Sequence, residues 1–259
     1  MTHTRFRNLP WIVTALALGL SSVALAGGFA DPIETAHKAD VWRANPAIQT
    51  DITVEFGGTQ MIDGTLLTDV AGGHVRIDLE NGTSFVFDGS TAWTSPADSE
   101  VQGGRFHVLT WSYFLLAPLK LQDDGTHLED LGKQPYRDGK KLPAARLTFG
   151  DNVGDTPDDW YVLYRDRQDR LVSMAYIVTF GKDTAAAEKE PHAITYESFE
   201  VVDGAPVPVH WKFWNWTAEG GIHGDPIGEV KLSNPRFVTP AADAFTAGKD
   251  AREEALPGR

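Results

Sequence analysis

The chain has 259 residues, a formal net charge of −13 and no cysteine. The acidity argues against nucleic-acid binding, which needs Lys and Arg to neutralise phosphates. The lack of cysteine excludes a disulfide framework and the lipid-attachment cysteine of a bacterial lipoprotein. A chain of this size buries about 70% of its unfolded surface and folds without such staples. One large β domain and two small ones both fit the length, but no linker or repeat divides the chain, so we predict a single domain over residues 27–259.

Residues 1–26 have the pattern of a secretion signal. Arg5 and Arg7 form its charged region, residues 11–23 its apolar region, and residues 24–26 (ALA) an A-x-A cleavage site. We expect cleavage after Ala26 and a soluble mature protein in a bacterial periplasm. An uncleaved anchor is the alternative, but the apolar part is shorter than the about 20 residues that span a bilayer.

A helix is expected next, over residues 31–44. Asp31 can cap its first turn, Pro32 suits the first helical position, and Asn45-Pro46 ends it. Apolar residues then recur at helical spacing along one face, which predicts that this face packs on the rest of the protein.

Strands follow, because apolar and polar residues alternate. The clearest hairpin is residues 74–80 (HVRIDLE), an Asn81-Gly82 turn typical of type I′, and a return strand over residues 83–87. Asp88-Gly89 then turns the chain into another strand over residues 90–94. Further strands are expected at residues 52–56, 126–131, 144–149, 160–165, 171–180, 192–202, 207–216 and 227–232.

The C-terminal part carries two prolines that suggest where the sheet ends. Pro235 and Pro240 bracket a segment that we assign to a sheet edge, because proline donates no ladder hydrogen bond. From Ala241 onward the chain is expected to be helical or irregular.

Residues 106–121 (FHVLTWSYFLLAPLKL) form the longest apolar run outside the N-terminus. Within residues 106–117 the apolar side chains recur at helical spacing, and Pro118 ends the pattern. A buried strand is the alternative. A helix that is apolar all round must be buried on more than one side, so this segment either fills a core or lines a cavity for an apolar ligand.

Aromatic residues crowd the strand over residues 207–216. Trp211, Phe213, Trp214 and Trp216 alternate along it and must face both sides of the sheet. Aromatic side chains of this kind either fill the gap between a curved sheet and its helices or line a pocket for acyl chains.

No catalytic motif is present in the sequence, and we expect no cofactor and no metal site. The acidic segment over residues 151–159 (DNVGDTPDD) lacks calcium-loop spacing, which favours a solvated hairpin loop. An enzyme remains an alternative: His74, His107 and His210 could converge with carboxylates in a cleft, as in an envelope hydrolase. A structural or signalling module whose cavity is filled by its own side chains is a third possibility.

The order of these elements resembles the LolA/LolB-like superfamily of periplasmic lipoprotein carriers and related lipid-binding proteins. Residues 85–93 (FVFDGSTAW) are similar to its "DG…W" segment, and residues 171–180 after Asp169-Arg170 to its long strand. The resemblance is closer to a poorly characterised branch than to the carrier itself. The chain is longer around residues 134–159 and 184–191, and no arginine matches the carrier's functional one, so lipoprotein handover is left open.

The resemblance implies a mainly β fold: a strongly curved, half-open antiparallel sheet of about 11–12 strands, with short helices over its concave face. We therefore predict a carrier, not an enzyme, that holds a lipid, an acylated protein or another apolar ligand in that face. It would act as a monomer with transient membrane or envelope-protein contacts. The helix over residues 106–117 would be a lid that fills the empty cavity. The predicted lining residues are Trp93, Phe106, Trp111, Phe114, Leu115, Tyr164, Tyr176 and Trp214.

Overall fold

The computed structural model describes residues 27–151 and 153–256, so the predicted secretion signal at residues 1–26 lies outside the described residues. The strands are β1 (Ala47–Phe56), β2 (Thr59–Asp69), β3 (Val75–Leu79), β4 (Ser84–Phe87), β5 (Ala92–Ser95), β6 (Thr126–Arg137), β7 (Lys140–Phe149), β8 (Tyr161–Arg165), β9 (Leu171–Tyr176), β10 (His192–Val202), β11 (Ala205–Thr217), β12 (Gly221–Val238) and β13 (Arg252–Glu254). The helices are α1 (Gly27–Ala36), α2 (Ala39–Arg43), α3 (Gly104–Leu116) and α4 (Thr184–Ala187), with a 3₁₀ turn at Ala117–Leu119.

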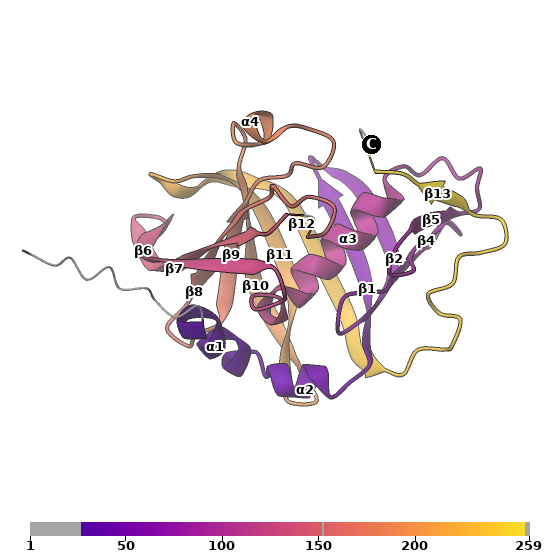
Figure 1. Cartoon of the computed structure of the whole chain (residues 1–259), viewed down its shortest axis with the longest axis horizontal. Coiled ribbons are helices and arrows are strands. Elements are labelled where there is room, and N and C mark those ends of the chain that lie inside the picture. The colour runs from indigo at the N-terminus through magenta and orange to yellow at the C-terminus, as the bar shows by residue number, and fades with distance from the viewer. Residues whose placement is uncertain (1–26, 152, 257–259) are drawn as a thin grey trace, which may run out of the picture.

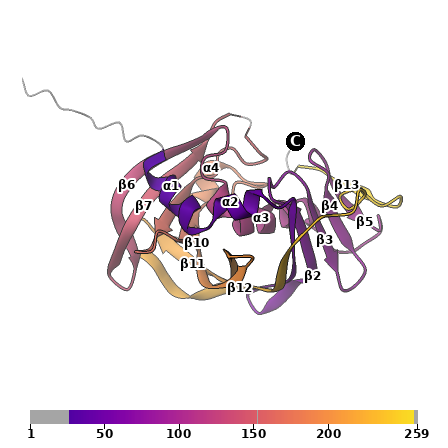
Figure 2. The ribbon, with the colours of Figure 1, turned by 90° about the horizontal axis from the view of Figure 1, so that it is seen from below.

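All of these strands belong to one sheet. Neighbours in the chain pair antiparallel from β6 to β12, β12 pairs with β1, and β1 to β5 follow in order with β13 at the edge. A single parallel bridge between Ile222 and Arg137 joins β12 back to β6. The sheet bends around α1, α2 and α3, and α3 crosses its concave side (Figures 1 and 2). A mainly β, curved antiparallel sheet with short covering helices is thus confirmed, with 13 strands in the described residues.

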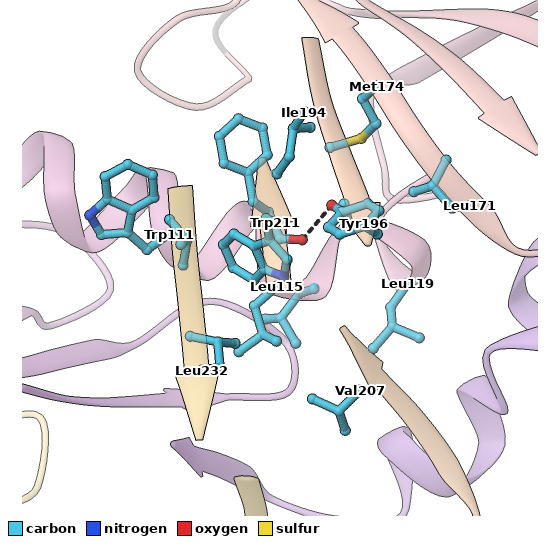
Figure 3. Close-up of a cluster of buried hydrophobic side chains, with 14 of the residues drawn as sticks. Trp111, Leu115, Leu119, Leu171, Met174, Ile194, Tyr196, Val207, Trp211 and Leu232 are labelled. Atoms are coloured by element: carbon cyan, nitrogen blue, oxygen red, sulfur yellow. Dashed lines mark hydrogen bonds between the residues drawn. The ribbon is translucent and has the colours of Figure 1, made fainter. Parts of the chain in front are cut away.

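The main core lies between α3 and the concave face of the sheet. Val108 and Leu115 of α3 are buried there. Ile194 and Trp211, from β10 and β11, belong to the same cluster as Leu115 (Figure 3). Within the described residues, no helix combines the length and the apolar composition that crossing a bilayer requires.

A second, smaller core lies on the opposite face of β8 to β11. It contains Tyr164, Trp214 and Trp216, whereas their neighbours at odd positions, such as Trp211 and Phe213, face α3. Side chains alternate between the two faces of a strand, so the prediction that these aromatics face both sides is confirmed. The β6–β7 hairpin covers this second core: the Tyr164 hydroxyl donates to the carbonyl of Pro135 at 3.0 Å, next to Trp214.

The predicted helix over residues 31–44 is instead two helices, and the first begins earlier, at Gly27. The break lies at Lys38, whose backbone is left-handed with φ 56°. The ring of His37 accepts a hydrogen bond at Nε2 from the backbone N–H of Leu171 at 3.0 Å. This buried contact between α1 and β9 holds the chain at the point where it turns.

The hairpin predicted around Asn81-Gly82 is present, but its turn is not type I′. Only Gly82 has a positive φ, of 87°, and the side chain of Asn81 accepts from the backbone N–H of Thr83 at 3.0 Å. Asn81 thus supports the turn through its side-chain oxygen and not through a left-handed backbone.

One strand prediction was wrong and another was incomplete. Beyond Lys231, β12 pairs with β1 alone, so the sheet edge expected around Pro235 is confirmed, but the segment is part of β12, which runs to Val238. The register with β1 shifts between Gln49 and Asp51. This bulge accommodates the missing N–H of Pro235. The strand expected over residues 171–180 ends at Tyr176, where the chain leaves the sheet.

Candidate functional site

Helix α3 is buried along most of its surface. The helix begins after Gly103, whose φ is 77°. It carries no polar face, and none of its residues is exposed. The prediction of a helix buried on more than one side is therefore confirmed for this segment. Its inner side packs in the main core, while Phe106, Leu109 and Thr110 are half-buried and border a cavity.

The cavity has a volume of about 640 Å³ and lies along α3. Its walls are α3, the facing strands β8 and β9, and the end of the β1–β2 hairpin. The aromatic residues that line it are Phe56, Phe106, Trp111, Tyr113, Phe114, Phe149, Tyr161, Tyr176, Phe180 and Phe213. Neighbouring rings are in contact: the centroids of Phe114 and Tyr176 are 5.2 Å apart, and those of Phe106 and Phe180 are 5.6 Å apart.

The acidic segment at the cavity edge is not simply solvated, contrary to our expectation. Asp155 forms a two-pronged ion pair with Arg105 of α3, with N–O distances of 2.6 and 2.9 Å. Asp159 is buried and accepts hydrogen bonds from the backbone N–H and the hydroxyl of Thr179, at 2.7 and 2.8 Å. These two bonds hold the chain after Tyr176 away from the sheet.

That segment supplies another wall of the cavity. Ile177, Val178 and Phe180 line it, although alternation predicts that they continue β9. Capture of Thr179 by a buried carboxylate is a tertiary contact, which no local pattern in residues 171–180 signals.

Half of the eight predicted lining residues line the cavity, and the other half do not. Phe106, Trp111, Phe114 and Tyr176 line the cavity. Leu115 is buried in the main core, behind the cavity wall. The other three lie elsewhere: Trp93 on β5, where its Nε1 donates to Asp88 at 2.9 Å, and Tyr164 and Trp214 in the second core.

Several lining residues were missing from the prediction although a signal was present. Phe106, Thr110 and Tyr113 are positions i, i+4 and i+7 of one helical face. Tyr161 has the opposite parity to Tyr164 on β8 and therefore faces α3. The contribution of Phe56 depends on how the β1–β2 hairpin folds over, and no local signal predicts it.

The three histidines of the enzyme alternative have different surroundings. His74 Nδ1 contacts Asp69 at 2.7 Å, and His210 Nε2 contacts Glu229 at 2.6 Å. His107 is buried and accepts at Nδ1 from the indole of Trp111 at 3.1 Å, and burial lowers its pKa to about 4. Among the described residues, no cluster of His, Cys, Asp or Glu is placed to hold a metal ion.

Neither a family model nor a curated protein matches the sequence. Solved structures do match the fold. A LolA superfamily protein from Nitrosomonas europaea superposes with a TM-score of 0.52 and 11% identity, covering 86% of this chain and 98% of that one. The chain has a LolA-like fold. A domain assigned to outer membrane lipoprotein sorting, from Vibrio parahaemolyticus, has a TM-score of 0.47 and 14% identity, covering 86% and 97% of the two chains.

Proposed function

We propose that the protein binds an apolar ligand, such as the acyl chain of a lipid or of an acylated protein, in the cavity beside α3. The observation that carries this proposal is the aromatic lining of a cavity of about 640 Å³. Ligand pockets in proteins are mostly apolar and span roughly 300–1,000 Å³. Each methylene that leaves water contributes about 0.8 kcal/mol, so a chain of about ten carbons is held without any charge pairing.

The LolA-like fold supports a carrier role in the bacterial envelope. With the secretion signal expected at residues 1–26, the protein would work in the periplasm as a monomeric single-domain carrier. It would meet a membrane or an envelope protein only while it loads or releases its ligand. The net charge of −13 disfavours lasting adhesion to an anionic membrane surface.

In this proposal α3 is a fixed wall and not the lid that the sequence suggested. Its inner residues Val108 and Leu115 are 0% and 1% exposed. Lifting the helix would bring this core surface into water, at a cost of several kcal/mol. The half-buried outer residues, such as Leu109 and Thr110, allow a ligand to enter alongside the helix without moving it.

A cavity-filling substitution tests the proposal. Thr110→Trp places an indole in the cavity from a half-buried position, whereas Thr53→Trp adds the same group at an exposed position on β1. Binding is measured by the fluorescence of N-phenyl-1-naphthylamine, an uncharged apolar probe. We expect wild type and Thr53→Trp to bind the probe alike and Thr110→Trp to bind it at least tenfold more weakly.

Two results would contradict the proposal. Wild type that leaves the probe in water would point to a structural module whose cavity takes no ligand. Equal binding by Thr110→Trp, with a wild-type circular dichroism spectrum, would place the probe at another site.

A further inference from the structure

Three tyrosines and one histidine cluster in the wall of the cavity. The ring centroids of Tyr113 and Tyr161 are 5.3 Å apart, those of Tyr161 and Tyr176 6.1 Å, and those of Tyr176 and His192 6.3 Å. The four side chains come from α3, β8, β9 and β10, and all of them line the cavity. The cluster brings three hydroxyl groups and one imidazole into the aromatic part of the lining.

The hydroxyl groups of these tyrosines have no protein partner within the described residues. The Tyr113 hydroxyl is buried and unpaired, and so is Nδ1 of His192. Buried tyrosines outside the cavity differ: the hydroxyl of Tyr196 donates to Phe114 at 2.6 Å, and that of Tyr164 donates to Pro135 at 3.0 Å. The molecule therefore satisfies its core tyrosines and leaves those of the cavity free.

An unpaired O–H group in an apolar site is unfavourable, because the group has lost its hydrogen bonds to water. The carboxylate of Asp159 accepts from Thr156 and Thr179 and forms no hydrogen bond with these tyrosines within the described residues. An acceptor for the buried Tyr113 hydroxyl must then come from whatever fills the cavity, and Tyr161 and Tyr176 follow in the same cluster of rings.

The charges around the cavity exclude a free anion as that acceptor. Lys120 is the one Lys or Arg among the described lining residues; its ammonium pairs with Asp123 and donates to the carbonyl of Ala71. Burial lowers the pKa of His192, so its ring is neutral at pH 7. A carboxylate or phosphate entering here would lose its hydration and gain no free cation.

We propose that the ligand carries an uncharged oxygen acceptor, an ester or amide carbonyl, which receives hydrogen bonds from the Tyr113, Tyr161 and Tyr176 hydroxyls. This inference rests on the proposed function and deepens it. The apolar chain of the ligand fills the aromatic part of the cavity, and its carbonyl lies at the tyrosine cluster. The ligand class is thus an esterified or amide-linked acyl chain and not a free fatty acid.

The test compares three ligands of equal chain length: methyl palmitate, palmitate and hexadecane. Each displaces N-phenyl-1-naphthylamine from wild type and from the Tyr113→Phe/Tyr161→Phe/Tyr176→Phe variant. In wild type, methyl palmitate should displace the probe about tenfold better than either other ligand, the effect of one or two net hydrogen bonds. In the triple variant the preference for methyl palmitate over hexadecane should disappear, while hexadecane binds as in wild type.

The controls distinguish a failure of this inference from a failure of the proposed function on which it rests. Tyr164→Phe removes a hydroxyl outside the cavity and should keep the preference for the ester. Tyr113→Phe alone should reduce the preference and serves if the triple variant does not fold. The inference is overturned if palmitate binds wild type as well as its methyl ester does. It is also overturned if both phenylalanine variants keep the preference for methyl palmitate over hexadecane. Wild type that binds neither the probe nor any of the three ligands would instead overturn the proposed function.

Discussion

The hydroxyl of Tyr196 donates a hydrogen bond of 2.6 Å to the backbone carbonyl of Phe114 (Figure 3). In a regular helix this carbonyl would accept from the N–H four residues later, but that residue is Pro118, which has none. The side chain from β10 therefore replaces the helix's own donor. This hydrogen bond therefore supports the C-terminal end of α3, joins the helix to the sheet and keeps the buried carbonyl of Phe114 paired.

Removing this hydroxyl should destabilise the protein. Tyr196→Phe leaves the Phe114 carbonyl unpaired in the core, so the free energy of unfolding should fall by about 1–3 kcal/mol. Tyr113→Phe is the matched control, because its hydroxyl is buried without a partner and its loss should cost little or be stabilising. Urea denaturation measures both, and equal losses in the two variants would contradict the assignment.

The ion pair between Arg105 and Asp155 should contribute more than an exposed one. Its side chains are 11% and 17% exposed, whereas Arg43, which pairs with Glu34, is 53% exposed. Arg105→Ala leaves the shielded Asp155 carboxylate without its partner and should lower the free energy of unfolding by on the order of 3 kcal/mol. Arg43→Ala should lower it by less than about 1 kcal/mol. Chemical denaturation at low and high salt checks this: a cost for Arg105→Ala no larger than that for Arg43→Ala would show that the pair is solvated.

Stability should fall as the pH decreases from about 6.5 to 4. Burial lowers the pKa of His107 to about 4, and burial together with the Arg170 guanidinium does the same for His37. Between these values the unfolded chain binds a proton at each ring and the folded chain does not. With respect to these two groups, the protein is therefore most stable above pH 6.5. Below that pH the free energy of unfolding falls by about 1.4 kcal/mol per pH unit for each histidine.

A substitution at His107 isolates its share of this slope. His107→Gln keeps an acceptor for the Trp111 indole but cannot titrate, so the loss of stability that His37 and His107 together cause between pH 6.5 and 4 should shrink by about half. If the free energy of unfolding of His107→Gln depends on pH as steeply as that of wild type, the explanation is wrong.

Hydrogen exchange separates a wall from a lid. If α3 is a fixed wall, backbone amides from Val108 to Leu116 should exchange only by global unfolding, as slowly as those of β10 and β11. Amides near Phe180, outside the sheet, should exchange faster. Exchange of the α3 amides well before those of the strands would restore the lid that the sequence suggested.

Local patterns were sufficient to predict much of the fold. Alternation identified β10 and β11, and the end of α3 follows from Pro118. β2 was missed, because Asp63-Gly64 interrupts its pattern like a turn. The structure shows why glycine stands there: a Cβ at Gly64 would lie 2.0 Å from the carbonyl oxygen of Asp78 on β3. Such a close approach between strands is visible only once the strands are paired.

The cavity was predictable only in part. The apolar run gave Phe106, Trp111 and Phe114 because helical spacing concentrates large side chains along one segment. Tyr164 and Trp214 are aromatic like the true lining residues, but strand parity places them on the other face of the sheet. The wall at Phe180 could not be predicted at all, since it depends on how Asp159 captures Thr179 across the fold.

The position of a bound ligand tests the central claim most directly. Crystals grown with a methyl palmitate that carries bromine at its chain end would reveal the bromine by anomalous diffraction. The account predicts a bromine peak inside the cavity, beside the aromatic rings of α3, with the ester carbonyl within hydrogen-bond distance of Tyr113, Tyr161 or Tyr176. A cavity without ligand density at a saturating concentration, or a bromine peak only on the outer surface, would contradict it.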